Sequence, residues 1–403
     1  MRIGVMGHGF MTWGGGIDFL RTVMSSMLHA DDHVELHLLM PTRGPRIHAL
    51  NAARRTYRSA RAMFGRKVHS AHLADSHHLL EMVATLERPV DTHEIDIGAS
   101  AIDRVSRRLS LHALIPAFSP LPQAFAIPWV GYLYDYQHRY YPELFTAKER
   151  ARRDQAFARM LEHASTVIVN SRAVAEDAKQ FNPGTRARVF ALPFNAAPVP
   201  TWLKPGQSPA HRLGITKPYF IICNQFWKHK DHETAFDAFA RFAVRHADVD
   251  LVCTGTTSDY RHPEHVPALL RRLAQDRITD RVHILGMVSK ADQIELLKGS
   301  IALIQPTLFE GGPGGGAAYD AVSLGVRCVL SDIAVNREIA DEPGISLFAA
   351  RDAAALAQAL DALASRPSSV DQRAEALTTQ GHLRRAACGT QILAAVDYAR
   401  AHR

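Results

Sequence analysis

The sequence of 403 residues has only four cysteines and no CxxC pair. We predict that Cys223, Cys253 and Cys328 lie in strands and Cys388 in a helix, so reduced thiols that act as small core residues are expected. No run of about 18 apolar residues is present, and the sequence therefore predicts no membrane-spanning helix. The apolar run at residues 1–6 is too short for a signal peptide and is typical of a first strand. We therefore expect a cytoplasmic protein.

Other missing patterns exclude further classes of protein. There is no zinc-finger spacing, no RNP-like aromatic motif and no helix-turn-helix pattern, so we expect no nucleic-acid partner. No internal repeat of short period is visible, which argues against solenoids and propellers. Gly7-His-Gly9 begins a dinucleotide-binding GxGxxG pattern, but Thr12 stands where the third glycine belongs. We expect no redox cofactor.

Candidate metal motifs are also weak. Asp248-Val-Asp250 has the form of a DxD motif, but it lies between a predicted helix and a predicted strand, where Asp is a common turn residue. His229 and His232 form an HxxH pair without an apparent third ligand. The sequence therefore predicts no metal site.

Positive charge is concentrated near the N-terminus, within an overall net charge of +7. Residues 41–67 contain no acidic residue and eight basic ones: Arg43, Arg46, Arg54, Arg55, Arg58, Arg61, Arg66 and Lys67. Such a segment should attract an anionic surface, either lipid headgroups at the inner face of the cell membrane or a diphosphate-linked acceptor. The alternative is a solvated basic helix face.

Length and periodicity predict two α/β domains. A chain of 403 residues with 47% hydrophobic composition can bury more than one ordinary core. Alternating strand-like and helix-like segments indicate doubly wound parallel sheets on both sides of a proline-rich stretch at residues 196–218. The predicted strands are 3–6, 34–40, 129–133, 166–170, 219–223, 250–255, 282–285, 301–305 and one at Cys328; the predicted helices are 17–29, 233–245, 266–275, 291–298, one from about Ala317, and 371–401.

The most informative segment is a glycine-rich loop that follows the predicted strand 301–305. Glu310 opens the loop, and its glycines are Gly311, Gly312, Gly314, Gly315 and Gly316. Glycines let backbone N–H groups approach a ligand, and the following helix directs its partly positive N-terminus to the same place. The carboxyl end of a strand in an open parallel sheet is also where such folds bind ligands. We expect an anion there, most simply a phosphate; alternatively the loop only joins strand to helix.

This segment resembles the signature of the retaining GT-B glycosyltransferases of family 4, in which an acidic residue, a glycine-rich loop and a second acidic residue recur. Glu310 corresponds to the first acid, and Asp320-Ala321 replaces the usual Glu-Ala. Nine residues, Gly311 to Tyr319, separate the acids, which is longer than the usual spacing. The downstream segments 323–325 and 329–332 fall where the family places them.

The resemblance implies two Rossmann-like domains that face each other across a cleft. Residues 1–197 would bind the acceptor, residues 198–380 the nucleotide-sugar donor, and residues 381–403 would form a helix that returns to the N-terminal domain. Gly14, Gly15 and Gly16 would face the donor phosphates from the first domain. A glycine triplet at the start of a helix can approach a pyrophosphate without obstruction by Cβ.

The resemblance also implies donor contacts from the second domain. Lys230 corresponds to a lysine that neutralises the donor diphosphate, whereas Asn224 stands where the family has an arginine, so Lys228 is the candidate for that missing charge. Asp320 would accept a hydrogen bond from the ribose, and Glu338 is a weaker candidate for a polar contact in the cleft. The lysines would otherwise be ordinary surface charges.

In the first domain, a loop rich in aromatic and titratable residues follows the predicted strand 129–133. It resembles the family segment in which a His or a His-Asp pair lies beside the sugar. Asp135 and His138 are both candidates, and the resemblance does not choose between them. Alternatively His138 caps a helix or fills an aromatic cluster.

The implied activity is transfer of a hexose-type sugar from a nucleoside diphosphate-sugar to a hydroxyl of a glycan or lipid-linked glycan, with Glu310 orienting the sugar. The family mechanism implies no metal, and the nucleotide-sugar is a substrate rather than a cofactor. Two alternatives stay open: a nucleotide-sugar epimerase or hydrolase, and a noncatalytic nucleotide-sugar-binding protein.

Overall fold

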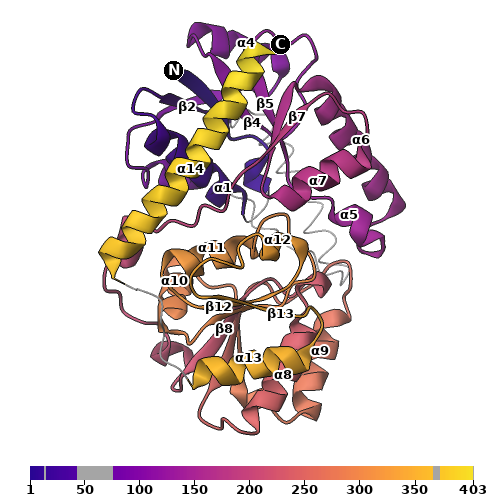
Figure 1. The fold of residues 1–403 in the computed structure, drawn as a ribbon, viewed down its shortest axis with the longest axis vertical. Coiled ribbons are helices and arrows are strands. Elements are labelled where there is room, and N and C mark those ends of the chain that lie inside the picture. Colours follow the sequence, from indigo (N-terminus) through magenta and orange to yellow (C-terminus); the bar gives the residue numbers. More distant parts are fainter. Residues whose placement is uncertain (13–14, 43–75, 366–372, 403) are drawn as a thin grey trace, which may run out of the picture.

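The computed structural model describes residues 1–12, 15–42, 76–365 and 373–402, and these residues form two lobes that each contain a parallel sheet (Figure 1). In the N-terminal lobe the strand order is β3-β2-β1-β4-β5-β6-β7. These strands are β1 (Arg2–Met6), β2 (Glu35–Pro41), β3 (Asp91–Ile95), β4 (Ala113–Ala117), β5 (Trp129–Leu133), β6 (Thr166–Val169) and β7 (Arg188–Ala191). Its helices are α1 (Gly16–Ala30), α3 (Ser76–Val83), α4 (Ala99–Arg108), α5 (Gln137–Tyr140), α6 (Ala147–His163) and α7 (Arg172–Phe181).

The C-terminal lobe repeats this architecture with the strand order β10-β9-β8-β11-β12-β13. The strands are β8 (Tyr219–Cys223), β9 (Asp250–Thr254), β10 (Val282–Gly286), β11 (Leu303–Gln305), β12 (Cys328–Ser331) and β13 (Ile345–Phe348). The helices are α8 (His232–Ala243), α9 (His265–Gln275), α10 (Lys290–Gly299), α11 (Gly315–Ser323), α12 (Ala334–Arg337) and α13 (Ala353–Ala364). The predicted pair of doubly wound domains is confirmed.

Both sheets are buried on their two faces, which explains why their central strands are continuous apolar runs. In β1, Ile3 and Val5 point to a core shared with α1 and the C-terminal helix, while Met6 belongs to the core on the other face. In the C-terminal lobe Phe220 and Ile221 of β8 divide between two cores in the same way. The cysteines at 223, 253, 328 and 388 are free thiols in strands and in the last helix, as predicted.

The last helix, α14 (Ala374–Ala401), leaves the C-terminal lobe and packs along α1 in the N-terminal lobe (Figure 1). Gly389 makes the close packing possible, because a Cβ atom at this position would lie 2.0 Å from the carbonyl oxygen of Ser26. Ile392 and Val396 are fully buried in the core above β1. The returning helix predicted near the C-terminus is confirmed.

Four strands were not predicted from the sequence, and each has a physical reason. β3, β7 and β13 lie at sheet edges. β3 is mainly polar, and β7 and β13 have only four residues each. The remaining strand, β4, contains Pro116, which cannot donate to a strand ladder, and its pairing with β5 is irregular between Leu114 and Ala117.

The basic segment 41–67 lies outside the described residues except for positions 41 and 42. Within the described part of the chain, none of the helices combines the length and the apolar character needed to span a bilayer.

Candidate active site

The candidate site lies where the strand order of the C-terminal sheet reverses direction. The central strands β8 and β11 are neighbours, and the chain leaves them toward opposite edges of the sheet, through α8 to β9 and through α11 to β12. The loops that follow them, 224–231 and 306–314, therefore begin at the carboxyl edge of the sheet, at the switch point where open parallel sheets bind ligands. Both loops carry the residues that the sequence singled out.

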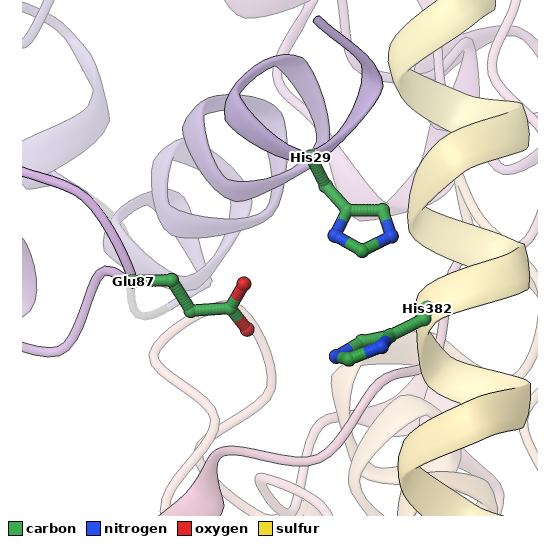
Figure 2. A group of neighbouring side chains, drawn as sticks. All are labelled: His29, Glu87 and His382. Carbon is green, nitrogen blue, oxygen red and sulfur yellow. The ribbon is translucent and has the colours of Figure 1, made fainter. Parts of the chain in front are cut away.

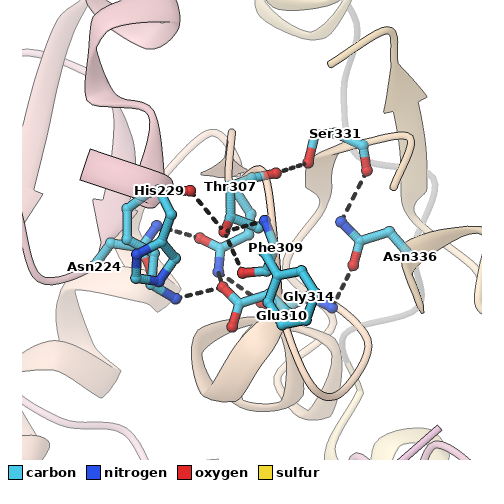
Figure 3. A network of polar contacts seen from close by, with 10 residues as sticks. Asn224, His229, Thr307, Phe309, Glu310, Gly314, Ser331 and Asn336 are labelled. Atoms are coloured by element: carbon cyan, nitrogen blue, oxygen red, sulfur yellow. Dashed lines mark hydrogen bonds and ion pairs between the residues drawn. The ribbon is translucent and has the colours of Figure 1, made fainter. Parts of the chain in front are cut away.

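Hydrogen bonds join these two loops (Figure 3). The amide of Leu308 donates to the carbonyl of His229 at 2.8 Å, and the hydroxyl of Thr307 donates to the same carbonyl at 3.3 Å. At the strand ends the side-chain amide of Asn224 donates to Gln305 Oε1 at 2.5 Å. The loop after β8 is therefore held in one place relative to the glycine-rich loop.

The two loops bring Lys230 and Glu310 into direct contact. Lys230 Nζ donates to Glu310 Oε1, and each of these side chains is 13% exposed. An ammonium has three donors and a carboxylate has two oxygens, so both groups keep capacity for a further partner. The pair thus places a cation and a carboxylate side by side at the switch point.

The glycine-rich loop has a defined conformation. Gly314 and Gly315 adopt left-handed backbone angles, with φ of 63° and 62°, which favour glycine. The amide of Gly314 donates to Asn336 Oδ1 at 2.6 Å, and its carbonyl accepts from Gln305 Nε2 at 2.7 Å (Figure 3). Helix α11 then begins at Gly315, earlier than the predicted start near Ala317. The first-turn N–H groups of a helix have no intrahelical partners and can bind an anion; here the Gly315 amide donates to the carbonyl of Gly312 at 3.2 Å.

Gln305 and Asn336, which position this loop, were not recognised from the sequence. Gln305 is 1% exposed and Asn336 is fully buried. Asn336 also donates to the carbonyl of Ser331 at 2.8 Å, so it ties the loop to the end of β12. For Gln305 the available signal was a single polar residue at the end of an otherwise apolar strand. Asn336 lies in the short helix α12, where no comparable signal was present.

Asp320 lies on the buried face of α11, directed to α10 rather than to the Lys230–Glu310 pair. Its Oδ2 accepts from Lys290 Nζ at 2.6 Å and from Gln293 Nε2 at 3.2 Å. Lys290 Nζ is also 3.6 Å from Asp18 Oδ2 in the other lobe. Burial opposes the charge on Lys290, but the carboxylates of Asp320 and Asp18 outweigh it and raise the pKa of this lysine.

Asp135 follows β5 and lies against the glycine-rich loop of the other lobe. A Cβ atom on Gly311 would be 2.2 Å from the carbonyl oxygen of Tyr134 and 3.1 Å from Asp135 Cβ. The Asp135 carboxylate accepts from the amide of Gln137 at 2.9 Å and lies 3.6 Å from Arg153. Burial raises the pKa of Asp135, and the charge of Arg153 opposes this rise.

His138 has a different environment from Asp135. Its side chain is fully buried, and its Nε2 pairs with Asp154 Oδ1 of α6 at 2.8 Å. The imidazole packs among aromatic rings, including those of Phe145 and Phe157. The structure therefore places His138 in the aromatic cluster that supports α5, and not at the surface of the glycine-rich loop.

Glu338 connects the two lobes. Its carboxylate accepts from the backbone amides of Arg172 at 3.0 Å and Ala173 at 2.8 Å, at the N-terminus of α7. A carboxylate is stabilised there by the unpaired amides and by the helix dipole. Nearby, Ser171 Oγ donates to the carbonyl of Gly311 at 3.1 Å. The glycine-rich loop therefore lies between the lobes.

Other cations surround the site. Lys228 is exposed and begins the short 3-10 helix that ends at Lys230. Arg261 was not predicted; its side chain is 12% exposed and lies 5.2 Å from the ring centre of Trp227 and 5.6 Å from that of Phe145. Burial, with the charges of Lys230 and Arg261, holds the pKa of His229 well below its ordinary value.

Of the predicted glycine triplet, Gly14 lies outside the described residues. Gly15 immediately precedes α1, and α1 begins at Gly16. The first turn of α1 contains Asp18, which approaches Lys290 of the C-terminal lobe. The start of α1 thus faces the other lobe, and the contact of these glycines with donor phosphates stays a prediction.

Comparisons with known proteins agree with this fold. Residues 217–366 match the model of the family described as Glycosyl transferases group 1. Sucrose-phosphate synthase from Thermosynechococcus elongatus has a similar structure, with a TM-score of 0.61 at 16% identity, over 98% of this chain and 97% of that chain. The fold is GT-B. The family match and this fold together support a glycosyltransferase.

Two further solved structures have the same arrangement. HepE of Anabaena in complex with UDP aligns with a TM-score of 0.57 at 15% identity, over 98% of each chain. The UDP-forming trehalose-phosphate synthase of Burkholderia xenovorans in complex with glucose-6-phosphate aligns with a TM-score of 0.59 at 12% identity, over 98% of this chain and 99% of that chain. No curated protein matches the sequence.

Proposed function

We propose that this chain is a retaining glycosyltransferase of family 4 that transfers a hexose-type sugar from a nucleoside diphosphate-sugar to a hydroxyl of a glycan or lipid-linked glycan. The observation that carries the proposal is the Lys230–Glu310 pair beside a glycine-rich loop at the switch point. A cation, a carboxylate and a helix N-terminus in one place suit a diphosphate that is joined to a sugar. The structures of HepE with UDP and with UDP-glucose support the same donor class.

In the proposed complex, residues 198–380 hold the donor. Lys230 and Lys228 neutralise the diphosphate, with help from amides of the loop. Because the Gly314 amide is bound by Asn336, we assign this contact to Gly311, Gly312 and Gly316 and to the first turn of α11. Gly15 and Gly16 approach the phosphates from the N-terminal lobe.

The ribose is assigned to Asp320. Both side-chain contacts of this carboxylate use Oδ2, from Lys290 and Gln293. Oδ1 is therefore the atom that we assign to a ribose hydroxyl. Burial raises the pKa of Asp320, and the charge of Lys290 opposes this rise. In its ionised form the carboxylate acts as an acceptor only.

The reaction that we propose proceeds on one face of the sugar. The bond between the anomeric carbon and the leaving phosphate oxygen breaks, the acceptor oxygen bonds to that carbon, and the acceptor proton passes to the leaving phosphate oxygen. Negative charge grows on the departing diphosphate, and fixed cations such as Lys230 stabilise it more in the transition state than in the ground state. Glu310 orients the sugar through its hydroxyls, and this mechanism assigns no step to a metal ion.

For the N-terminal lobe we favour Asp135 over His138 as the residue beside the sugar. Asp135 lies against Gly311, whereas the His138 ring has no exposed surface and is paired with Asp154. His138 then acts as a positioning residue for α5. Asp135→Asn should lower transfer without changing nucleotide affinity, and an unchanged transfer rate would remove Asp135 from the site.

The acceptor is proposed from the sequence alone. The basic segment 41–67 suits an anionic acceptor or an anionic membrane surface, which would place the enzyme at the inner face of the cell membrane. Pelleting of the protein with vesicles that contain anionic lipid, but not with neutral vesicles, would support this placement.

Thermal unfolding in the presence of UDP, GDP, dTDP, ADP and CMP tests the donor site first. A ligand at about 100 times its dissociation constant stabilises the native state by about 2.7 kcal/mol. Stabilisation by one nucleoside diphosphate identifies the donor for transfer assays with generic acceptors. Sugar conversion without an acceptor would favour the epimerase or hydrolase, and binding without any turnover the noncatalytic protein. No response to any nucleotide would contradict the proposed donor site.

A further inference from the structure

A group of histidine and glutamate side chains lies far from the candidate active site. Within the described part of the chain, one group of three potential metal ligands has its ligand atoms within 4.8 Å of one another: His29, Glu87 and His382. Figure 2 shows the three side chains pointing toward a common space from α1, from the segment after α3 and from α14. Residues that are distant in the sequence thus converge at the contact between α1 and the returning helix.

We propose that His29, Glu87 and His382 bind one Zn²⁺ ion that joins α14 to the N-terminal lobe. Two imidazole nitrogens and one carboxylate oxygen are a ligand set that zinc uses in proteins, with water in the fourth position. The imidazole ring centres are 4.7 Å apart, so small side-chain rotations bring both nitrogens to one ion.

The surroundings leave room for the fourth ligand. A cavity of about 320 Å³ opens beside the group and is lined by His29, Glu87 and Asp32, among others. Its volume accommodates water molecules, since one water in the liquid occupies about 30 Å³. Water on the ion completes a tetrahedral site there.

A neighbouring arginine positions the Glu87 carboxylate. Glu87 Oε1 accepts from Arg385 Nη1 at 2.6 Å, and Arg385 also donates to the carbonyl of Pro198 at 2.9 Å. This contact holds the carboxylate in place and leaves Oε2 for the metal.

The site serves structure and not the transfer reaction. His29 lies near the C-terminal end of α1, whereas the glycines that begin α1 face the other lobe. A helix rises about 1.5 Å per residue, so about 20 Å separate His29 from the start of the helix. Zinc binding at this site therefore does not depend on the proposed glycosyl transfer.

Zinc titration of the full chain, after treatment with a chelator, tests the proposal. We expect one equivalent of Zn²⁺ by calorimetry, visible absorption bands of tetrahedral Co²⁺ on substitution, and a rise in the unfolding midpoint on the order of 5 °C at saturating zinc. The double variant His29→Ala/His382→Ala should lose this binding by more than the about 10- to 100-fold that an outer-shell substitution costs.

Matched variants distinguish zinc binding at this site from zinc binding by other histidines of the chain. His211→Ala changes an exposed histidine of the C-terminal lobe and should leave zinc binding unchanged. Glu87→Gln alters a side chain that is 41% exposed, so it should fold normally and still weaken zinc binding, even if the double variant does not fold. Absence of zinc binding by the parent chain, or undiminished binding by Glu87→Gln and the folded double variant, would overturn the proposal.

Discussion

Replacing Lys230 with alanine tests the central contact of the candidate site. The Lys230 side chain is 13% exposed and contacts Glu310, so its charge is only partly screened by water. A hydrogen bond to a charged group contributes about 1.5–3 kcal/mol. Loss of this amount from diphosphate binding corresponds to an increase in Kd of about 10- to 150-fold.

Lys228→Ala is the matched control. Lys228 is exposed, and exposed ion pairs contribute about 0–1 kcal/mol. We therefore expect at most about a fivefold increase in Kd for this variant. Added salt should reduce the effect of Lys228 more than that of Lys230, because salt screens exposed charges more strongly than partly buried ones.

The Lys230→Ala variant also leaves Glu310 without its cation, and the free carboxylate would repel a bound diphosphate. The double variant Lys230→Ala/Glu310→Gln removes this repulsion, so it should recover part of the lost affinity. The difference between the two variants separates the direct contact from the repulsion.

The assay is calorimetric titration with the nucleoside diphosphate that stabilises the parent chain, at low and high salt, together with unfolding midpoints to verify folding. Equal affinity of the folded Lys230→Ala variant and the parent would refute the assignment of Lys230. A larger loss for Lys228→Ala than for Lys230→Ala would move the diphosphate contact to the exposed lysine.

Three further outcomes follow from the structure. Glu310→Gln should abolish sugar transfer while nucleotide affinity and the unfolding midpoint stay near those of the parent; unchanged turnover would exclude Glu310 from the mechanism. Gly311→Ala should slow transfer and lower stability by about 1–3 kcal/mol, because its Cβ would lie 2.2 Å from the carbonyl oxygen of Tyr134. Gly316→Ala, where a Cβ meets no atom within 4 Å, is the control for that variant, and equal urea denaturation curves for the two would contradict the argument. Burial lowers the pKa of His232 from 6.5 to about 3. Between these two pH values the unfolded chain binds a proton at this residue and the native state does not. The free energy of unfolding therefore falls by about 1.4 kcal/mol for each unit by which the pH falls from 6.5 toward 3. His232→Phe should remove this contribution, which urea unfolding at pH 4 to 7 would measure, and an unchanged pH slope would count against it.

Much of the fold was predictable because parallel strands are short apolar runs that alternate with amphipathic helices. Strands such as 129–133 and 219–223 were predicted with the bounds that the structure has. The strands that escaped prediction are those whose pairing depends on neighbours from distant parts of the chain, such as β3 and β13. The polar residues of β3 carry no local strand signal, and the four residues of β13 form too short a run to be recognised.

The glycine-rich loop was recognisable in the sequence because glycines beside a strand end have few other uses. The roles of Gln305 and Asn336 were hidden, since a lone amide side chain does not indicate which carbonyl or amide it will meet. The division between Asp135 and His138 was hidden for the same reason. The two residues are close in the sequence, yet one lies against the other lobe and the other packs into α6.

The sequence by itself determined most strands and helices of the two sheets and the place of the loop, because these depend on local periodicity and on backbone freedom. The return of the last helix to the N-terminal lobe was implied by the family resemblance. Only the tertiary structure decided the partners of each charge: Lys230 with Glu310, Asp320 with Lys290, and Glu338 with the start of α7. Such partners come from segments far apart in the chain, and burial sets the strength of each interaction. The local sequence around a charged residue indicates neither its distance from such a partner nor its burial.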